Sequence, residues 1–529
     1  MRALVIGSGP NGLVCAINLA AAGLDTTVLE QASTPGGGVS SSEATLPGFV
    51  HDDCAGFFPL SAASPAIRGL GLERHGLEWI DPEVPMVHPF LDGTSIELHR
   101  DLDATVASLE RAAQGAGVAW RGLTAPLLQH EELVRRTALS TFPPLLPGLR
   151  LALKLRRRSL ELSRLMLGSV ANLGRELFDH PAPTAWLCGS TAHSDLTPGS
   201  AGGAAFGFAL NWLGHAVGWP IPRGGARSLS EAMVAKLVDD GGRLRCDARV
   251  ERVLCRRGRV SGVRLADGEE LPAEVVVATV SAGPFAAMLP DGALPGRLIR
   301  RLARWRYGLG TFKLDWALGG PVPWQAEEAR RAAVVHIGDT VEAFFRSAQE
   351  SGLGRVPAAP AMVVGQQSLH DPTRAPAGRH TLYAYARVPA RYQQGDEAVA
   401  DRLEARIESF APGFRDLVLG RQFRSPAALE RENPSFVGGD LGGGSFELDQ
   451  QFLFRPAPEL VRHRTGLRGL YVASASVHPG AGAHGVQGAG AAAAVLADRS
   501  AFRLKRGRSV RIRSTISGRG PQREDRSSV

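Results

Sequence analysis

The sequence predicts an α/β protein in which a Rossmann-like dinucleotide-binding domain carries a large inserted α+β domain. Three observations lead to this expectation. A short apolar run from Ala3 to Ile6 leads into a glycine-rich turn and a helical pattern, strand-like runs return between residues 243 and 277, and a second glycine-rich stretch follows an apolar run near residue 470. Short apolar runs are typical of buried parallel strands, and a glycine-rich turn between strand and helix is typical of a nucleotide site.

Length and composition favour a folded protein with more than one domain. The chain has 529 residues, of which 44% are hydrophobic and 21% charged, and both values are ordinary for a globular protein. The five cysteines include no C-x-x-C pair, so neither a disulfide framework nor a redox dithiol is indicated and a reducing cytoplasm fits. No apolar run reaches the eighteen residues or so that a membrane-spanning helix needs.

The net charge of +8 belongs to the C-terminal end. Residues 499–529 contain ten Lys or Arg and two acidic residues, so the rest of the chain is neutral. We expect 499–529 to be a basic disordered tail. It is either a solubilising extension, which we favour, or a tether to anionic lipid or nucleic acid. Phe502 is its only aromatic residue, so no specific nucleic-acid partner is expected.

The turn after the first strand has the spacing of a dinucleotide-binding motif. Gly7-Ser8-Gly9-Pro10-Asn11-Gly12 joins the apolar run to the helical pattern. The first glycine permits a tight turn, the second lets backbone approach a pyrophosphate, and the third lets helix and strand pack closely. The helix start offers unpaired N–H groups and the positive end of its dipole to the phosphates. Glu30 ends a second strand candidate, Thr26 to Leu29, where an acid accepts hydrogen bonds from an adenosine ribose.

These features leave NAD and FAD open, because either cofactor presents a ribose to such an acid. The next segment favours FAD. Pro35-Gly36-Gly37-Gly38 follows Glu30 closely, and an acid followed by a double glycine resembles the extended motif of the amine oxidase and phytoene desaturase superfamily, whose cofactor is FAD. The resemblance implies that these glycines lie along the diphosphate and ribityl chain. Val39 stands where many members carry arginine, so no side-chain contact to the diphosphate is expected there.

Two later blocks extend the resemblance. Arg243 to Arg264 alternates apolar and polar residues around Arg257-Gly258, as a β-hairpin does. Gly469 to Gly488 begins as a strand, passes through His478-Pro479-Gly480 and opens an alanine-rich helix. A His-Pro-Gly stretch followed by spaced glycines is similar to the end of phytoene desaturase (carotenoid dehydrogenase) related oxidoreductases. The resemblance covers nearly everything before the tail and implies an FAD-binding domain of the GR2/amine-oxidase type.

The resemblance also implies a domain division and a set of cofactor contacts. Residues 1–60, 221–300 and 461–498 are expected to form a discontinuous FAD-binding domain, and residues 61–220 and 301–460 an inserted substrate-binding domain. The expected cofactor-binding residues are Gly7, Ser8, Gly9, Pro10, Asn11, Gly12, Glu30, Gly37, Gly38, Val250, Ala475, Gly485 and Val486.

The implied function is an FAD-dependent oxidoreductase that removes hydride from a hydrophobic substrate, of isoprenoid, carotenoid or lipid-like type, to flavin N5. An acceptor such as oxygen or a quinone then reoxidises the flavin. His478 and His484 lie in the loop expected beside the flavin and are candidate catalytic acids or bases, and His215 is a weaker candidate. A redox-neutral flavin-dependent isomerase, an amine oxidase, and a non-catalytic flavoprotein acting through partners remain open. No metal site is expected, because Val134 stands where a zinc peptidase would need a second histidine.

The segment from Phe142 to Leu167 has two interpretations. It combines leucines with Lys154 and three consecutive arginines, Arg156 to Arg158. Such a segment either lies on a membrane surface and admits a lipid-like substrate, or forms an ordinary domain helix. We therefore expect a cytoplasmic protein, with peripheral membrane contact as an open alternative.

Overall fold

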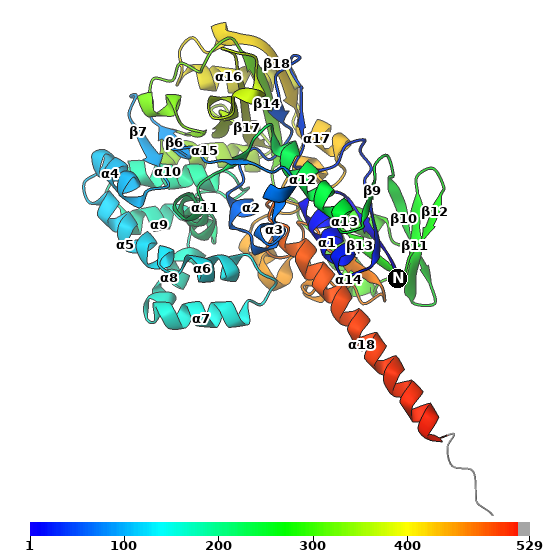
Figure 1. Ribbon diagram of the computed structural model, residues 1–529. Helices are drawn as coiled ribbons and strands as arrows, with labels where there is room; N and C mark the ends of the chain where they lie inside the picture. Colours follow the sequence, from blue (N-terminus) through cyan, green and yellow to red (C-terminus); the bar gives the residue numbers. More distant parts are fainter. Residues whose placement is uncertain (517–529) are drawn as a thin grey trace, which may run out of the picture.

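The computed structural model describes residues 1–516 and is built around two large sheets that the chain visits in turn (Figure 1). The first sheet has five strands in the order β19-β13-β1-β2-β9, and all its neighbouring strands are parallel. Its strands are β1 (Arg2–Ile6), β2 (Asp25–Leu29), β9 (Arg243–Arg245), β13 (Val275–Ala278) and β19 (Leu470–Val472). Segments from both ends and from the middle of the chain therefore form one parallel sheet.

Both faces of this sheet are buried, which explains why its strands are continuous apolar runs. Ala3 and Val5 on β1 pack into a core with helices α1 (Pro10–Ala21), α12 (Ala226–Asp239) and α18 (Val486–Ile516). Leu4 and Ile6, which alternate with them, pack into a second core on the opposite face. The helices on one face and the second core on the other make this an α/β layer structure.

The second core is covered by a small antiparallel sheet and two helices. The sheet consists of β10 (Val250–Arg256), β11 (Arg259–Leu265) and β12 (Glu270–Pro272), and the helices are α13 (Ala282–Ala287) and α14 (Gly296–Ala303). β10 and β11 pair across Arg257 and Gly258, both of which have positive φ. That conformation is the type I′ turn favoured in two-residue hairpins. The alternating pattern in the sequence thus corresponds to a hairpin.

The other large sheet is mixed and has seven strands in the order β18-β14-β17-β16-β15-β6-β7. Only β6 and β15 are parallel neighbours. The strands are β6 (Met86–Pro89), β7 (Ser95–Leu98), β14 (Gly310–Leu318), β15 (Val334–Ile337), β16 (Met362–Gly365), β17 (His380–Val388) and β18 (Val418–Arg424). Helix α16 (Asp396–Glu408) packs on one face through Val399, Leu403 and Ile407.

A helical layer covers the opposite face of the mixed sheet, and Figure 1 shows it as the cyan and blue part of the molecule. Its helices are α4 (Leu102–Ala112), α5 (Ala116–Leu128), α6 (Glu131–Ala138), α7 (Leu145–Leu155), α8 (Arg158–Leu167), α9 (Val170–Leu177), α10 (Pro181–Thr191) and α11 (Gly203–Val217). The fold is therefore of the α/β class, with a Rossmann-like parallel sheet and a mixed sheet that supports an inserted helical layer.

The C-terminal helix α18 continues past the position where the sequence suggests disorder. It begins beside α1, where a Cβ atom on Gly488 would lie 2.0 Å from the Asn11 carbonyl oxygen, and its far half extends away from the body in Figure 1. The helix includes residues 499–516, the first part of the expected tail. Residues 517–529 of the expected tail lie outside the described residues. None of the helices described is both long and apolar enough to cross a membrane.

Candidate functional site

A cavity of about 580 Å³ lies at the carboxyl ends of the parallel strands. Ile6 of β1, Glu30 after β2 and Ser474 after β19 line one side of it, and Tyr385 of β17 and Leu210 of α11 line another. Ligands of open α/β sheets bind in this position, outside the carboxyl ends of the strands. The cavity thus brings together segments from both halves of the chain.

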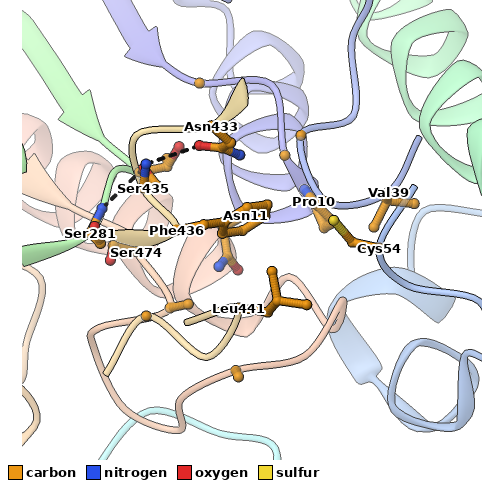
Figure 2. A pocket seen from close by; sticks show the side chains of 18 of the residues that line it. Pro10, Asn11, Val39, Cys54, Ser281, Asn433, Ser435, Phe436, Leu441 and Ser474 are labelled. Carbon is orange, nitrogen blue, oxygen red and sulfur yellow. Dashed lines mark hydrogen bonds between the residues drawn. The ribbon is translucent and has the colours of Figure 1, made fainter. Parts of the chain in front are cut away.

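The glycine-rich turn and the start of α1 form one wall. Gly7, Gly9, Pro10 and Asn11 line the cavity (Figure 2). A Cβ atom on Gly12 would lie 1.9 Å from the Gly7 carbonyl oxygen, so Gly12 permits helix and turn to touch and does not itself line the cavity. Helix α1 has proline in its first turn and no side-chain cap, so its first N–H groups are left for a ligand.

Two details of this wall fit a bound diphosphate. A Cβ atom on Gly9 would have one neighbour within 4 Å, the Gly36 carbonyl oxygen at 3.9 Å, so the space beside Gly9 is open. The Asn11 Oδ1 atom is buried and has no hydrogen-bond partner within the part of the chain that the structure describes. Open space beside backbone, together with a helix N-terminus, is what an anionic diphosphate requires. The residues present therefore fit FAD.

Glu30 holds the two glycine-rich segments in place. The Ser8 N–H and hydroxyl donate to Glu30 Oε2 at 2.8 and 2.6 Å, and the Ala32 N–H donates to Oε1 at 3.0 Å. The Gly36 N–H donates to Ser8 Oγ at 3.1 Å. Each carboxylate oxygen can accept more than one bond, and Glu30 lines the cavity, so its carboxylate is available to a ribose. Ser8 is fully buried behind the wall and acts through Glu30.

Other predicted contact residues lie at both ends of this wall. Gly37 and Gly38 line the cavity beside Gly9, and Val250 lines it at the start of β10. The Ala248 N–H donates to the Glu30 carbonyl oxygen at 2.7 Å, which places the start of β10 next to the end of β2. Ala475 lines the cavity at the carboxyl end of β19. The sequence blocks thus converge on one wall.

The C-terminal glycine-rich loop lines the cavity through Ala481, Gly482 and Ala483. Gly485 and Val486, the predicted contacts of this loop, are not among the described residues that line the cavity. A Cβ atom on Gly485 would lie 2.5 Å from Val14 of α1, so the glycine permits packing between the loop and that helix. The backbone contact expected at Gly485 and Val486 stays a prediction, while residues 481–483 of the same loop line the cavity.

His484 is buried inside the loop. Its Nδ1 accepts the Val486 N–H at 3.2 Å, at the first residue of α18, and its carbonyl oxygen accepts the Ser64 hydroxyl at 2.5 Å. Burial lowers the pKa of His484 to about 4, so the ring is neutral at physiological pH. These two hydrogen bonds hold the loop in place. Among residues 1–516, those lining the cavity do not include His484.

His478 lies outside the cavity as well. Its ring packs between Phe142 and Phe452, with ring centroids 5.3 and 6.0 Å away, and burial lowers its pKa to about 4. His215, the weaker candidate, accepts the Trp120 Nε1–H at 3.0 Å within the helical layer. Among the described residues, neither His478 nor His215 lines the cavity.

The facing wall is mainly apolar, and most of it comes from the inserted segments. Its aromatic and leucine side chains are Phe57, Phe58, Leu60, Phe206, Leu210, Trp219, Leu441 and Phe446. Phe206 and Phe446 meet edge to face with ring centroids 5.1 Å apart. Sequence reasoning did not find this wall, because its members are scattered over almost four hundred residues without a motif.

A buried arginine that the sequence did not single out supports the loops between the two walls. Arg455 is fully buried and donates to the carbonyl oxygens of Ala475, Ser445 and Gly442 at 3.1, 3.1 and 2.9 Å. Burial lowers its pKa to about 10, so it remains charged at neutral pH. Gly442 and Ala475 line the cavity, and Arg455 therefore joins a loop of each wall.

A second buried network connects the inserted part to the nucleotide-binding part. The Arg374 guanidinium pairs with Asp52 at 2.9 Å and Asp371 at 3.0 Å, and all three side chains are almost fully buried. Asp52 also accepts the Ala226 N–H at the start of α12 at 2.7 Å. Breaking one partner of such a pair leaves a buried charge uncompensated.

Comparisons with known proteins agree with this geometry. The model of a family described as flavin containing amine oxidoreductase matches residues 11–497. Pyridine nucleotide-disulfide oxidoreductase domain-containing protein 2 from Mus musculus is 28% identical over 94% of this chain and 93% of its own. Hydroxyneurosporene desaturase from Cereibacter sphaeroides is 29% identical over 94% of this chain and 98% of its own.

Solved structures show the same fold. An engineered triple mutant of putrescine oxidase superposes with a TM-score of 0.61 at 16% sequence identity, over 94% of this chain and 99% of its own. At this level of identity, the likeness bears on the fold alone. The sequence-based expectations of an FAD cofactor, of the fold, and of kinship with the phytoene desaturases are confirmed.

Proposed function

Because the chain belongs to the flavin containing amine oxidoreductases and is an FAD-dependent oxidoreductase, we propose that it dehydrogenates an apolar, isoprenoid-like or lipid-like substrate. One observation carries the proposal: a single cavity is lined by the glycine-rich dinucleotide segments on one wall and by aromatic and leucine side chains on the other. A cofactor on the first wall and an apolar substrate on the second would be in direct contact, because no protein segment would separate them. A largely apolar cavity with a few polar groups is the usual form of a small-molecule site.

The nucleotide-binding wall suggests which residues hold FAD. In our proposal, backbone at Gly9, Gly37 and Gly38 and the start of α1 lie along the diphosphate, and Glu30 accepts the ribose hydroxyls. Val250 lies at the adenine end. Bound FAD would supply the hydride-accepting N5 atom, and the protein would supply orientation and exclude water.

The C-terminal loop serves the other end of the cofactor. Ala475 and Gly482 line the cavity, and we assign them to the ring system. His478 and His484 are then supports of this loop, since their contacts are with protein groups. The electron acceptor is oxygen or a quinone in this proposal.

The apolar wall favours a hydrocarbon substrate. The desaturase relative is named for a carotenoid, and Trp219, Phe206 and Leu210 offer the surface that such a chain needs. An amine substrate is less favoured, because Arg387 lines the same cavity and would repel an ammonium group. A redox-neutral isomerase would use the same two walls, and product analysis distinguishes it.

The test is anaerobic reduction of the purified holoprotein by a panel of isoprenoid alcohols, acids, amines and carotenes, followed by product analysis. We expect at least one compound to bleach the flavin spectrum and to be recovered with an additional double bond. Phe206→Glu, which introduces a charge into the apolar wall, should abolish the bleaching and retain FAD. Val118→Glu, at an exposed position on α5, is the matched control.

Two outcomes of this test contradict the proposal outright, and a third favours another reaction. One is bleaching by amines alone. The other is an unreduced flavin with every member of the panel, a result that would favour a non-catalytic flavoprotein. An isomerised product without net oxidation would favour the isomerase instead.

We also propose that α7 and α8 contact an anionic membrane surface from which such a substrate enters. Leu145, Leu149 and Leu153 of α7 are 74%, 60% and 68% exposed, and Arg150 and Lys154 directly follow the second and third of these leucines. Exposed leucines beside cations suit the lipid interface. Vesicles that contain phosphatidylserine should co-sediment the wild-type protein and not Leu149→Glu/Leu153→Glu. Equal sedimentation of both proteins would contradict the contact.

A further inference from the structure

One corner of the cavity is polar and lies on β17. Leu382, Ala384 and Ala386 of this strand pack into the core under α16. Tyr385 and Arg387 alternate with them, so they lie on the opposite face, and both line the cavity. His193, just after α10, lines the cavity beside them. The three polar side chains interrupt an otherwise aromatic wall.

Tyr385 begins a chain of hydrogen bonds that leads into the protein. Its hydroxyl lies 2.9 Å from His193 Nδ1, and His193 Nε2 lies 2.9 Å from Nε2 of the buried His336. Trp219 packs edge-on against the His193 ring with centroids 5.5 Å apart. The position of the phenol is therefore fixed by two rings behind it.

The hydrogen bonds indicate which nitrogen atoms of His193 and His336 carry a proton. Burial lowers the pKa of His193 to about 3 and that of His336 well below its ordinary value, so both rings are neutral, with one donor and one acceptor each. His336 Nδ1 is buried and has no partner among the described residues. Orphan buried N–H groups are rarer in proteins than unused acceptors, so this atom is the unprotonated one. His336 Nε2 then donates to His193 Nε2.

Each hydrogen bond in this series is donated toward Tyr385, so the Tyr385 hydroxyl proton is not used within it. His193 Nδ1 carries the second proton and donates it to the Tyr385 oxygen, so the Tyr385 O–H is not used within the chain. Burial raises the pKa of Tyr385 to about 12, and the hydroxyl stays protonated. Since Tyr385 lines the cavity, this hydroxyl is a donor for a ligand.

Arg387 adds a positive charge that forms no salt bridge with an acid in the described part of the chain. Its Nη1 donates to Thr311 Oγ1 at 2.7 Å and its Nη2 to the His193 carbonyl oxygen at 2.5 Å, and both acceptors are neutral. Its Nε is buried and without a partner in the described chain. The nearby Asp440 is occupied by the N–H groups of Gly308, Gly442 and Gly444. A partly buried cation that has only neutral hydrogen-bond partners is costly, which makes an incoming anion favourable.

We propose that this corner binds a carboxylate of the substrate, which makes the substrate an apolar acid. The hydrocarbon chain lies along the aromatic wall, and the carboxylate accepts hydrogen bonds from Arg387 and Tyr385. This inference rests on the proposed function, because it names the class of apolar substrate for the same cavity. An alcohol would leave the Arg387 charge unpaired, and an ammonium group would be repelled by it.

The test uses three probes with one carbon skeleton and different head groups: geranate, geraniol and geranylamine. Binding to the holoprotein is measured by isothermal titration calorimetry, and the flavin content of the same sample is read from its visible absorption. We expect geranate to bind about 10- to 100-fold more tightly than geraniol, as one or two charge-assisted hydrogen bonds imply. Geranylamine should bind more weakly than geraniol.

Three variants test whether Arg387 and Tyr385 are responsible for the preference for geranate. Arg387→Met should remove the preference for geranate, and Tyr385→Phe should weaken geranate by about 5- to 10-fold with little effect on geraniol, as the loss of one donor implies. Arg391→Met, at an exposed position outside the cavity, should match the wild type. If Arg387→Met does not fold, Tyr385→Phe still decides the question.

Equal binding of geranate and geraniol by the wild-type protein would overturn the inference. So would an unchanged preference in Arg387→Met or Tyr385→Phe, or an absence of geranate binding. A flavin-free protein would instead overturn the proposed function, and the absorption of the calorimetry sample reports that outcome separately.

Discussion

The substitution Gly9→Val should weaken FAD binding while leaving the stability of the fold nearly unchanged. Gly9 has φ −64° and ψ 171°, an extended conformation that valine adopts without strain. The one atom within 4 Å of an added Cβ is the Gly36 carbonyl oxygen at 3.9 Å. The valine side chain therefore enters the cavity beside the first turn of α1 and occupies space where backbone would approach the diphosphate.

The size of the effect follows from the lost contacts. If valine displaces the diphosphate from two N–H groups of the α1 start, at about 1.5 kcal/mol for each charge-assisted bond, the loss is ~3 kcal/mol, or more than about 100-fold in affinity for FAD. The free energy of unfolding of the apoprotein should change by less than about 1 kcal/mol, because an added Cβ atom at Gly9 would approach no described protein atom beyond its chain neighbours more closely than 3.9 Å.

FAD affinity is measured by titrating apoprotein with FAD and following quenching of flavin fluorescence, and stability by thermal melting of the apoprotein. Gly395→Val is the matched control, because Gly395 precedes α16 with φ −65° and ψ 144° and nothing lies within 4 Å of an added Cβ. Wild-type FAD affinity in Gly9→Val would refute the reasoning, since the diphosphate would then lie elsewhere.

Three further predictions concern the buried polar groups. His484→Ala should lower the free energy of unfolding by about 1–3 kcal/mol, measured by denaturant titration, because the Val486 N–H loses its buried acceptor. Arg374→Met should cost about 3–5 kcal/mol in the same assay, because Asp52 is left buried and unpaired, whereas the exposed Arg379→Met should cost less than about 0.5 kcal/mol. Since burial lowers the pKa of His484 from 6.5 to about 4, the unfolded chain binds more protons between these values. The free energy of unfolding should therefore fall as the pH drops from 6.5 to 4, by up to ~3 kcal/mol for each such histidine, and the melting temperature should fall with it. A melting temperature that is constant over this range would contradict the assignment of neutral buried rings.

The nucleotide-binding wall could be predicted from the sequence because its determinants are local. The Gly7 to Gly12 turn, Glu30 and the glycines after it each follow from spacing within about thirty residues. The hairpin around Arg257-Gly258 is local in the same way. The resemblance to a known family then supplied the cofactor, and the comparisons confirm it.

The substrate side could not be predicted, because it exists only in three dimensions. His193, Tyr385 and Arg387 come together through the pairing of β17 in the mixed sheet and the position of α10. The alternation of apolar residues with Tyr383, Tyr385 and Arg387 along β17 was a usable signal, but it indicates a strand face and not a cavity. His478 and His484 attracted attention through their motif, whereas the structure gives both of them protein contacts.

A crystal structure of the FAD-bound protein would test the arrangement of the two walls. We predict density for the adenosine ribose at Glu30, for the diphosphate beside Gly9, and for the flavin ring near Ala475 and Gly482, with one ring face open to the cavity that Tyr385 lines. A cofactor bound in the reverse direction, or a flavin ring separated from Tyr385 by protein, would contradict the proposed meeting of cofactor and apolar substrate in one cavity.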